Sequence, residues 1–100
     1  WSPLDCVEAW DHNPSAAQFI AWRWELPGSG WLCAAVNYAP QRGQCFVRLP
    51  CPELAGRQWC WRDLLGEAVY ERPGDDLLAR GLYLDLPGWG HHLFEVTVLP

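Results

Sequence analysis

"GLYLDLPGWGHHLFEV", residues 81–96, contains two stretches in which apolar and polar residues alternate. In the first stretch Leu82, Leu84 and Leu86 share one face, and Tyr83 and Asp85 share the other. A period of two is typical of a β-strand with one buried face, and the Pro-Gly-Trp-Gly sequence between the stretches is typical of a turn. The segment therefore predicts two strands joined by a tight turn, as the last hairpin of a β-sheet.

Two adjacent histidines, His91 and His92, open the second stretch. Neighbouring residues on a strand point to opposite faces of the sheet, so these two side chains cannot bind one metal ion from the same side. The sequence nominates no distant partner for either ring. We expect one histidine to pack near the end of the sheet and the other to be solvated, with no catalytic or metal-binding role.

Further strand-like segments with turn residues between them extend over the rest of the chain. Including the two above, they cover residues 16–26, 31–38, 44–50, 58–65, 67–72, 81–87 and 91–99. Strands at a spacing of about ten residues, without amphipathic helices between them, predict an antiparallel β-sandwich of about seven strands and Greek-key type. Residues 1–100 form a single domain, in which 1–15 are a lead-in segment with room for one short strand.

Pro- and Gly-rich stretches mark the predicted turns. "PGSG" at 27–30 predicts a hairpin turn, and "PGDD" at 73–76 predicts a turn in which Asp75 and Asp76 cap local backbone groups. Leu54 lies in a segment that is bounded by proline and long enough for only one helical turn.

Charge and composition exclude several classes of function. The formal net charge is −5, and all seven basic residues are arginine, which argues against a nucleic-acid partner. No apolar run approaches the roughly 20 residues that span a membrane, and there is no secretory signal. The chain begins at Trp1 without a methionine, so we expect it to be an excised piece of a longer protein.

The five cysteines indicate a reducing compartment. Cys33, Cys45 and Cys60 fall in apolar strand-like runs, where a free thiol behaves as a small hydrophobic group. We therefore expect reduced core thiols and a cytoplasmic location, although the sequence leaves one disulfide pair open. There is no C-x-x-C pair and no histidine at zinc-finger spacing, so no metal site is predicted.

No arrangement of residues typical of catalysis is found. The sequence lacks a G-x-S-x-G elbow and a Gly-rich phosphate loop, and no two carboxylates are visibly placed across a cleft. We therefore assign no catalytic, cofactor-binding or metal-binding residue and expect no cofactor.

The eight tryptophans offer a different chemistry. Trp22 with Trp24 and Trp59 with Trp61 form two i, i+2 pairs, each on one strand face, and we predict that both pairs belong to the core. The alternative is that coplanar exposed rings stack on sugar. Two other tryptophans, Trp31 and Trp89, flank turns, so we expect them to show an edge to solvent and consider them the candidate carbohydrate contacts.

Several segments together resemble a known family. They are "FIAWRW" (19–24), "CAAVNYAP" (33–40), "RGQCFVRLP" (42–50), "LAGRQWCWRDLLG" (54–66) and "VYERPGDDLLARGLYLDLPGWGHHLFEV" (69–96). In this order they resemble the tail of certain bacterial members of the alpha-amylase family of glycoside hydrolases. The resemblance covers residues 16–98, and none of these segments is a catalytic signature.

The resemblance implies that the chain is the excised C-terminal part of a longer enzyme, a β-sandwich behind a (β/α)8 barrel that carries the catalytic carboxylates. No barrel motif occurs in the chain, so no catalytic residue is carried over. The implied function is that of a non-catalytic accessory domain in carbohydrate metabolism. Its partner would be the barrel of the same chain, which it would stabilise. The whole enzyme would be a glycosidase or a transglycosidase. The alternative is a carbohydrate-binding module that holds alpha-glucan on exposed tryptophan faces.

Overall fold

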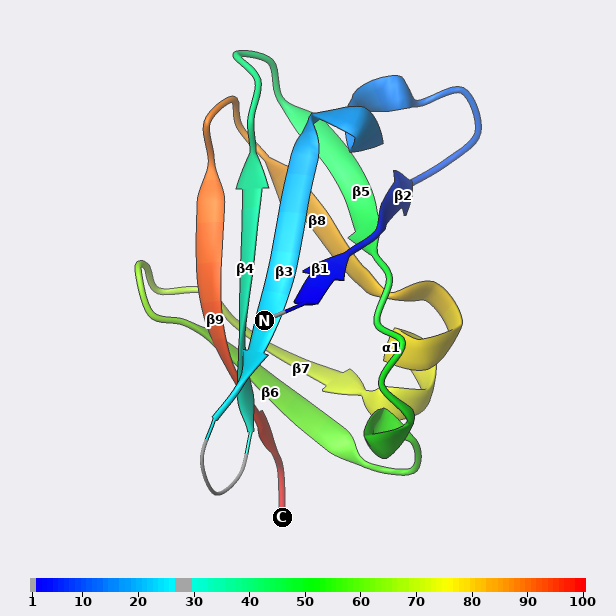
Figure 1. The fold of residues 1–100 in the computed structure, drawn as a ribbon, viewed down its shortest axis with the longest axis vertical. Coiled ribbons are helices and arrows are strands. Elements are labelled where there is room, and N and C mark those ends of the chain that lie inside the picture. The colour runs from blue at the N-terminus through cyan, green and yellow to red at the C-terminus, as the bar shows by residue number, and fades with distance from the viewer. Residues whose placement is uncertain (1, 27–29) are drawn as a thin grey trace.

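The fold is an antiparallel β-sandwich, as a computed structural model that describes residues 2–26 and 30–100 shows (Figure 1). A six-stranded sheet has the order β1-β3-β4-β9-β6-β7, and a three-stranded sheet has the order β2-β5-β8. The strands are β1 (Ser2–Leu4), β2 (Cys6–Glu8), β3 (Phe19–Glu25), β4 (Trp31–Asn37), β5 (Gly43–Val47), β6 (Gln58–Asp63), β7 (Val69–Pro73), β8 (Leu82–Leu86) and β9 (His91–Val98). Three short helices accompany them: η1 (Pro14–Gln18), η2 (Pro52–Leu54) and α1 (Gly74–Arg80). The predicted all-β sandwich is confirmed.

Each of the seven predicted segments contains a strand, and the lead-in adds two more. β1 pairs with β3 in the large sheet, and β2 pairs with β5 in the small sheet. Asp5 lies between them, and its carbonyl accepts a hydrogen bond of 2.8 Å from the backbone N–H of Arg48. Residues 2–8 therefore connect the two sheets along one side of the sandwich.

Alternating side chains of both sheets form the core. The predicted core residues Cys33, Cys45, Trp59 and Trp61 are buried, and so are Leu82, Leu84 and Leu86, the predicted apolar face of β8. Buried with them are Val47, Leu49, Asp63, Phe94 and Val96. Three aromatic rings meet edge to face at the centre, with Trp61 at 5.2 Å from Trp31 and 5.5 Å from Phe94 between ring centroids. Such edge-to-face contacts are the favoured geometry of buried aromatic pairs, and they add to the stabilisation from burial.

One predicted core face is wrong. On β3 the buried residues are Phe19 and Ala21, whereas Trp22 and Trp24 are only half-buried on the opposite face. Register explains the difference, because Ala21 pairs with Ala35, which is fully buried under the small sheet. A strand with large apolar residues on both faces does not reveal by its pattern which face turns inward.

The predicted Pro-Gly-Asp-Asp turn is also wrong, because residues Gly74–Arg80 form the α-helix α1. Asp75 and Asp76 lie in its first turn and Arg80 in its last, which suits the helix dipole. Leu77 is buried against the core. Gly74 lies so close to the Leu54 carbonyl that a Cβ atom would stand 1.6 Å from that oxygen, so only glycine fits there. Leu54 itself lies in η2, the single helical turn expected for its segment.

The two strands of residues 81–96 are both present, but they do not form a hairpin. β8 pairs with β5 in the small sheet, whereas β9 lies between β4 and β6 in the large sheet. The Pro-Gly-Trp-Gly segment therefore carries the chain from one sheet to the other (Figure 1). The predicted turn at 27–30 falls largely outside the described residues, and the strands on either side of it pair antiparallel.

Candidate functional site

The loops at one end of the sandwich are joined by a buried asparagine, Asn37, at the end of β4. Its Nδ2 donates to three backbone carbonyls, those of Gln41 at 2.8 Å, Leu86 at 3.2 Å and Pro87 at 3.1 Å. One side chain thus connects the β4–β5 loop to the segment that links β8 to β9. An asparagine in the otherwise apolar run "WLCAAVNY" is the only sequence signal for this connection.

Two exposed aromatic rings lie on these connected loops. The side chains of Trp89 and Tyr38 are 57% and 68% exposed, and their rings meet edge to face with centroids 5.5 Å apart. The backbone of Trp89 has φ +63°, an uncommon conformation for a bulky residue, and its N–H donates to the Ala39 carbonyl at 2.9 Å. Strained positions that hold an exposed side chain are frequent at binding sites, so this aromatic pair is the first candidate site.

The tryptophans that the sequence nominated as carbohydrate contacts have different surroundings. Trp89 is exposed, as expected. Trp31 is not, since only 4% of it is accessible and the Arg23 guanidinium lies 5.3 Å above its ring. Trp31 is the first residue of β4 and points inward beside Val96 of β9, so it belongs to the core. Sequence reasoning did not find Tyr38, because the loops that bring it to Trp89 are far apart in the chain.

The histidine pair has the division of roles that the sequence predicted, with one ring exposed and one packed. His91 is exposed, whereas the Nδ1 atom of His92 lies 2.7 Å from Oδ2 of Asp63, whose side chain is 6% exposed. The His92 ring also stacks on Phe94 at 4.6 Å between centroids. The His92–Asp63 contact joins β9 to β6 within one sheet, so we assign it a structural role.

Asp63 fixes the β6–β7 turn through its carboxylate. Oδ1 accepts hydrogen bonds from the backbone N–H groups of Leu65 at 3.0 Å and Leu93 at 3.2 Å. Burial opposes ionisation of this group, but the hydrogen bonds from His92, Leu65 and Leu93 outweigh it and hold the pKa of Asp63 below its ordinary value. The ionised form of Asp63 therefore stabilises the fold.

The outward side of the six-stranded sheet is a broad apolar surface, here called the outer sheet face. It comprises Ile20, Trp22 and Trp24 of β3, Leu32, Ala34 and Val36 of β4, and Leu93 of β9. These residues form cross-strand rows, such as Trp22, Ala34 and Leu93. Ile20 is 52% exposed, and the rings of Trp22 and Trp24 meet edge to face at 5.8 Å. A contiguous apolar surface of this kind is typical of an interaction site.

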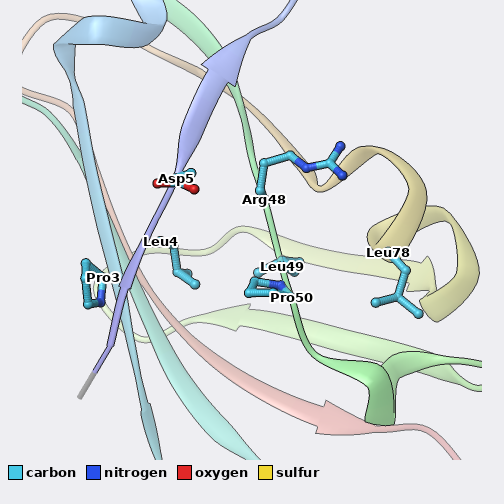
Figure 2. Close-up of a pocket in the computed structure, with 7 residues that line it drawn as sticks. All are labelled: Pro3, Leu4, Asp5, Arg48, Leu49, Pro50 and Leu78. Atoms are coloured by element: carbon cyan, nitrogen blue, oxygen red, sulfur yellow. The ribbon is translucent and has the colours of Figure 1, made fainter.

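A separate groove of about 360 Å³ lies where the lead-in strands face α1 (Figure 2). Leu4, Leu49 and Leu78 line it, with Asp5 and Arg48 also at its wall. The Arg48 guanidinium is turned toward α1, where it donates to the Ala79 carbonyl at 3.0 Å. No aromatic ring lines the groove, and its guanidinium is engaged, so this groove offers less specific chemistry than the aromatic pair.

The cysteines and acidic residues have structural surroundings. All five cysteines are free, and burial raises the pKa of the Cys33 thiol to about 12. Cys60, predicted as a core thiol, is half-buried on the opposite side of β6 from the core tryptophans. The Oδ1 atom of Asp75 accepts a hydrogen bond of 3.0 Å from the Gly56 N–H. Across residues 2–26 and 30–100, no three His, Cys, Asp or Glu side chains are grouped so that they could hold a metal ion.

Comparisons with known proteins give no relative: no family model, no curated protein and no solved structure matches the chain. In the described part of the chain, no helix is long and apolar enough to cross a membrane.

Proposed function

We propose that the chain is a non-catalytic accessory domain that packs through its outer sheet face against the catalytic barrel of an alpha-amylase-type enzyme. The observation that carries the proposal is the contiguous apolar surface formed by β3, β4 and β9. Burying it against a second domain would remove that apolar surface from water, at about 25 cal/mol per Å². The five free thiols suit a cytoplasmic enzyme.

Position within the sheet supports a docking role for this face. β3, β4 and β9 are consecutive strands in the middle of the large sheet, so the surface is backed by a continuous hydrogen-bonded layer. On the side of Leu93, the Arg62–Glu95 ion pair, 2.7 Å between Nη2 and Oε1, forms a polar border. An apolar centre with a polar rim is the usual composition of a stable interface.

The first test of this proposal is the reading frame that encodes the chain. We expect it to encode a (β/α)8 barrel as well, and a reading frame without one would refute the proposal. The barrel and this domain, expressed as separate polypeptides, should then associate. Trp22→Glu and Leu93→Glu in the outer sheet face should each abolish the association, whereas Tyr83→Glu on the other sheet should not.

Activity provides the second test. Incubated with starch, maltose and sucrose, the purified domain should give no turnover, because it offers no pair of carboxylates across a cleft. Turnover above a heat-killed control, surviving repurification, would contradict the non-catalytic assignment.

The exposed Tyr38–Trp89 pair favours a second candidate function, binding of alpha-glucan. Aromatic rings bind sugar through the C–H faces of the pyranose, and both rings here are open to solvent on loops held by Asn37. The domain should then be retained on insoluble starch. Trp89→Ala should release it, and Trp10→Ala is the matched control, since Trp10 is 53% exposed elsewhere in the chain. Equal effects of the two substitutions would argue against a site at Trp89.

A further inference from the structure

A groove of about 330 Å³ lies on the outward side of the three-stranded sheet, beside α1. Two aromatic residues, Phe46 of β5 and Tyr83 of β8, form its floor. They are cross-strand partners, and their rings are tilted by 55° with centroids 5.4 Å apart. Because their neighbours along each strand point into the core, these rings face outward, and Tyr83 is 45% exposed.

Two guanidinium groups, of Arg72 and Arg80, stand at the wall of this groove. The Arg72 guanidinium is positioned 5.1 Å above the Tyr70 ring, and Nη1 donates to the Glu71 carbonyl at 2.9 Å. Among the described residues neither arginine forms an ion pair, although the chain has twelve acidic residues and three other arginines are paired with carboxylates.

The lining of the groove holds two arginines and one carboxylate, Asp76, so it carries a net positive charge in a chain whose formal net charge is −5. Arg48 lines the groove of Figure 2 instead, and its guanidinium donates to the Ala79 carbonyl near the C-terminal end of α1. Two of the four arginines without an ion pair therefore line the groove, Arg72 just before α1 and Arg80 at its last position, whereas Arg48 and Arg57 lie outside it. A chain with a net charge of −5 does not attract anions in general, so an anion that binds here depends on direct contacts with Arg72 and Arg80.

The groove also contains a hydrogen-bond acceptor, the carboxylate of Asp76. Its lining thus combines two planar donor groups suited to a phosphate, an aromatic surface suited to a sugar ring, and an acceptor for hydroxyl groups. We propose that this groove binds a phosphorylated sugar. The phosphate lies between Arg72 and Arg80, the ring lies against Phe46 and Tyr83, and a hydroxyl donates to Asp76.

The floor of the groove lies on the three-stranded sheet, and Arg72 comes from β7 at the edge of the large sheet. The groove shares no residue with the outer sheet face, so covering that face would leave the groove open. The binding proposal therefore does not depend on the docking proposal.

Isothermal titration with three probes tests the proposal: glucose 6-phosphate, inorganic phosphate and glucose. We expect saturable binding of glucose 6-phosphate, weaker binding of inorganic phosphate and no measurable binding of glucose. Arg72→Gln and Arg80→Gln should each raise the Kd for glucose 6-phosphate about tenfold or more, because each removes charge-assisted hydrogen bonds. Arg57→Gln is the control, since it removes the same charge from an exposed position outside the groove.

Tyr83→Leu separates the ring contact from the phosphate contact. It should bring the Kd for glucose 6-phosphate close to that for inorganic phosphate. In NMR spectra of the wild type, the sugar phosphate should shift the resonances of Phe46 and Tyr83. No saturable binding, equal affinity of the wild type for both phosphates, or the same loss with Arg57→Gln would each overturn the proposal.

Discussion

Replacing Asn37 with alanine tests whether the two loops that carry Tyr38 and Trp89 form one rigid unit. The Asn37 amide is fully buried, and its two N–H hydrogens serve three backbone carbonyls on the two loops. The Asn37 backbone N–H donates to Gly90 at 2.8 Å and does not depend on the side chain, so the variant should still fold.

The size of the effect follows from these contacts. Removing the amide breaks three hydrogen bonds, of which the one to Leu86 is buried and the other two are partly buried, and a buried carbonyl left without a donor costs about 1–3 kcal/mol. Water that enters the space of the lost side chain recovers part of this, so we expect a total loss of about 2–4 kcal/mol. Domains of this size have about 5–15 kcal/mol of stability in all, so the change is large but should not unfold the protein.

Urea unfolding followed by circular dichroism measures the loss, with Asn13→Ala as the matched control. Asn13 is also buried, and its Oδ1 caps η1 by accepting from the Ser15 N–H at 3.1 Å and the Ser15 hydroxyl at 2.6 Å, while its Nδ2 donates to Oε1 of Gln44 at 3.1 Å. A side-chain cap of this kind is worth about 1 kcal/mol. In protein labelled with 5-fluorotryptophan, Asn37→Ala should move the ¹⁹F resonance of Trp89. A loss no greater than that of Asn13→Ala, together with an unmoved Trp89 resonance, would show that other contacts hold the loops.

Three further predictions concern the core, the thiols and the pH dependence of stability. Phe94→Ala should lower the free energy of unfolding by about 3–5 kcal/mol, because the ring is fully buried, and an unchanged urea midpoint would show that Phe94 is not in the core. His91→Ala should lower the urea midpoint only slightly and leave the metal content at zero by elemental analysis. A thiol reagent should find five thiols after denaturation without reductant. In the native protein Cys6 should react first, because a hydrogen bond with Cys45 lowers the pKa of Cys6. The fast phase of the reaction should vanish in Cys6→Ser, and a fast phase that remains in this variant would contradict the assignment. Since the pKa of Asp63 is lowered by folding, the ionised group stabilises the protein above its unfolded pKa of about 3.9, and this contribution is lost as the pH falls through the lower folded value. The stability difference between wild type and Asp63→Asn should therefore shrink below about pH 4, and a difference independent of pH would show that the charge of Asp63 is not what matters.

The strands could be predicted because half-buried strands carry a visible period of two. Leu82, Leu84 and Leu86 show it, and all three are buried. The pairing of the strands could not be predicted in the same way. Pro-Gly-Trp-Gly is suited both to a hairpin and to a passage between sheets, and β8 and β9 join different sheets because of contacts with distant strands.

The candidate site, too, could be predicted only in part from the sequence. Trp89 could be nominated because it lies in a turn, where a ring is often exposed. Its neighbour Tyr38 could not, because the contact depends on loop packing that the three Asn37 hydrogen bonds create. Trp31 borders a turn as well, but its place in the β4 register directs it inward. Position beside a turn therefore does not by itself determine whether a side chain points into the core or toward solvent.

The wrong prediction of which face of β3 is buried bears on function. Packing alone would favour the larger residues, Trp22 and Trp24, in the core, yet Phe19 and Ala21 take that place. The small Ala21 and Ala35 pair leaves room for the core aromatic rings, and the bulky pair is left on the outside of the sheet. A sequence that keeps two tryptophans on an outward face keeps apolar surface in water at a cost to solubility. For that reason the outer sheet face is stronger evidence for an interaction surface than any single exposed side chain. The groove beside α1 that is lined by Arg72 and Arg80 shares no residue with this face, so substitutions in one should leave the binding properties of the other unchanged.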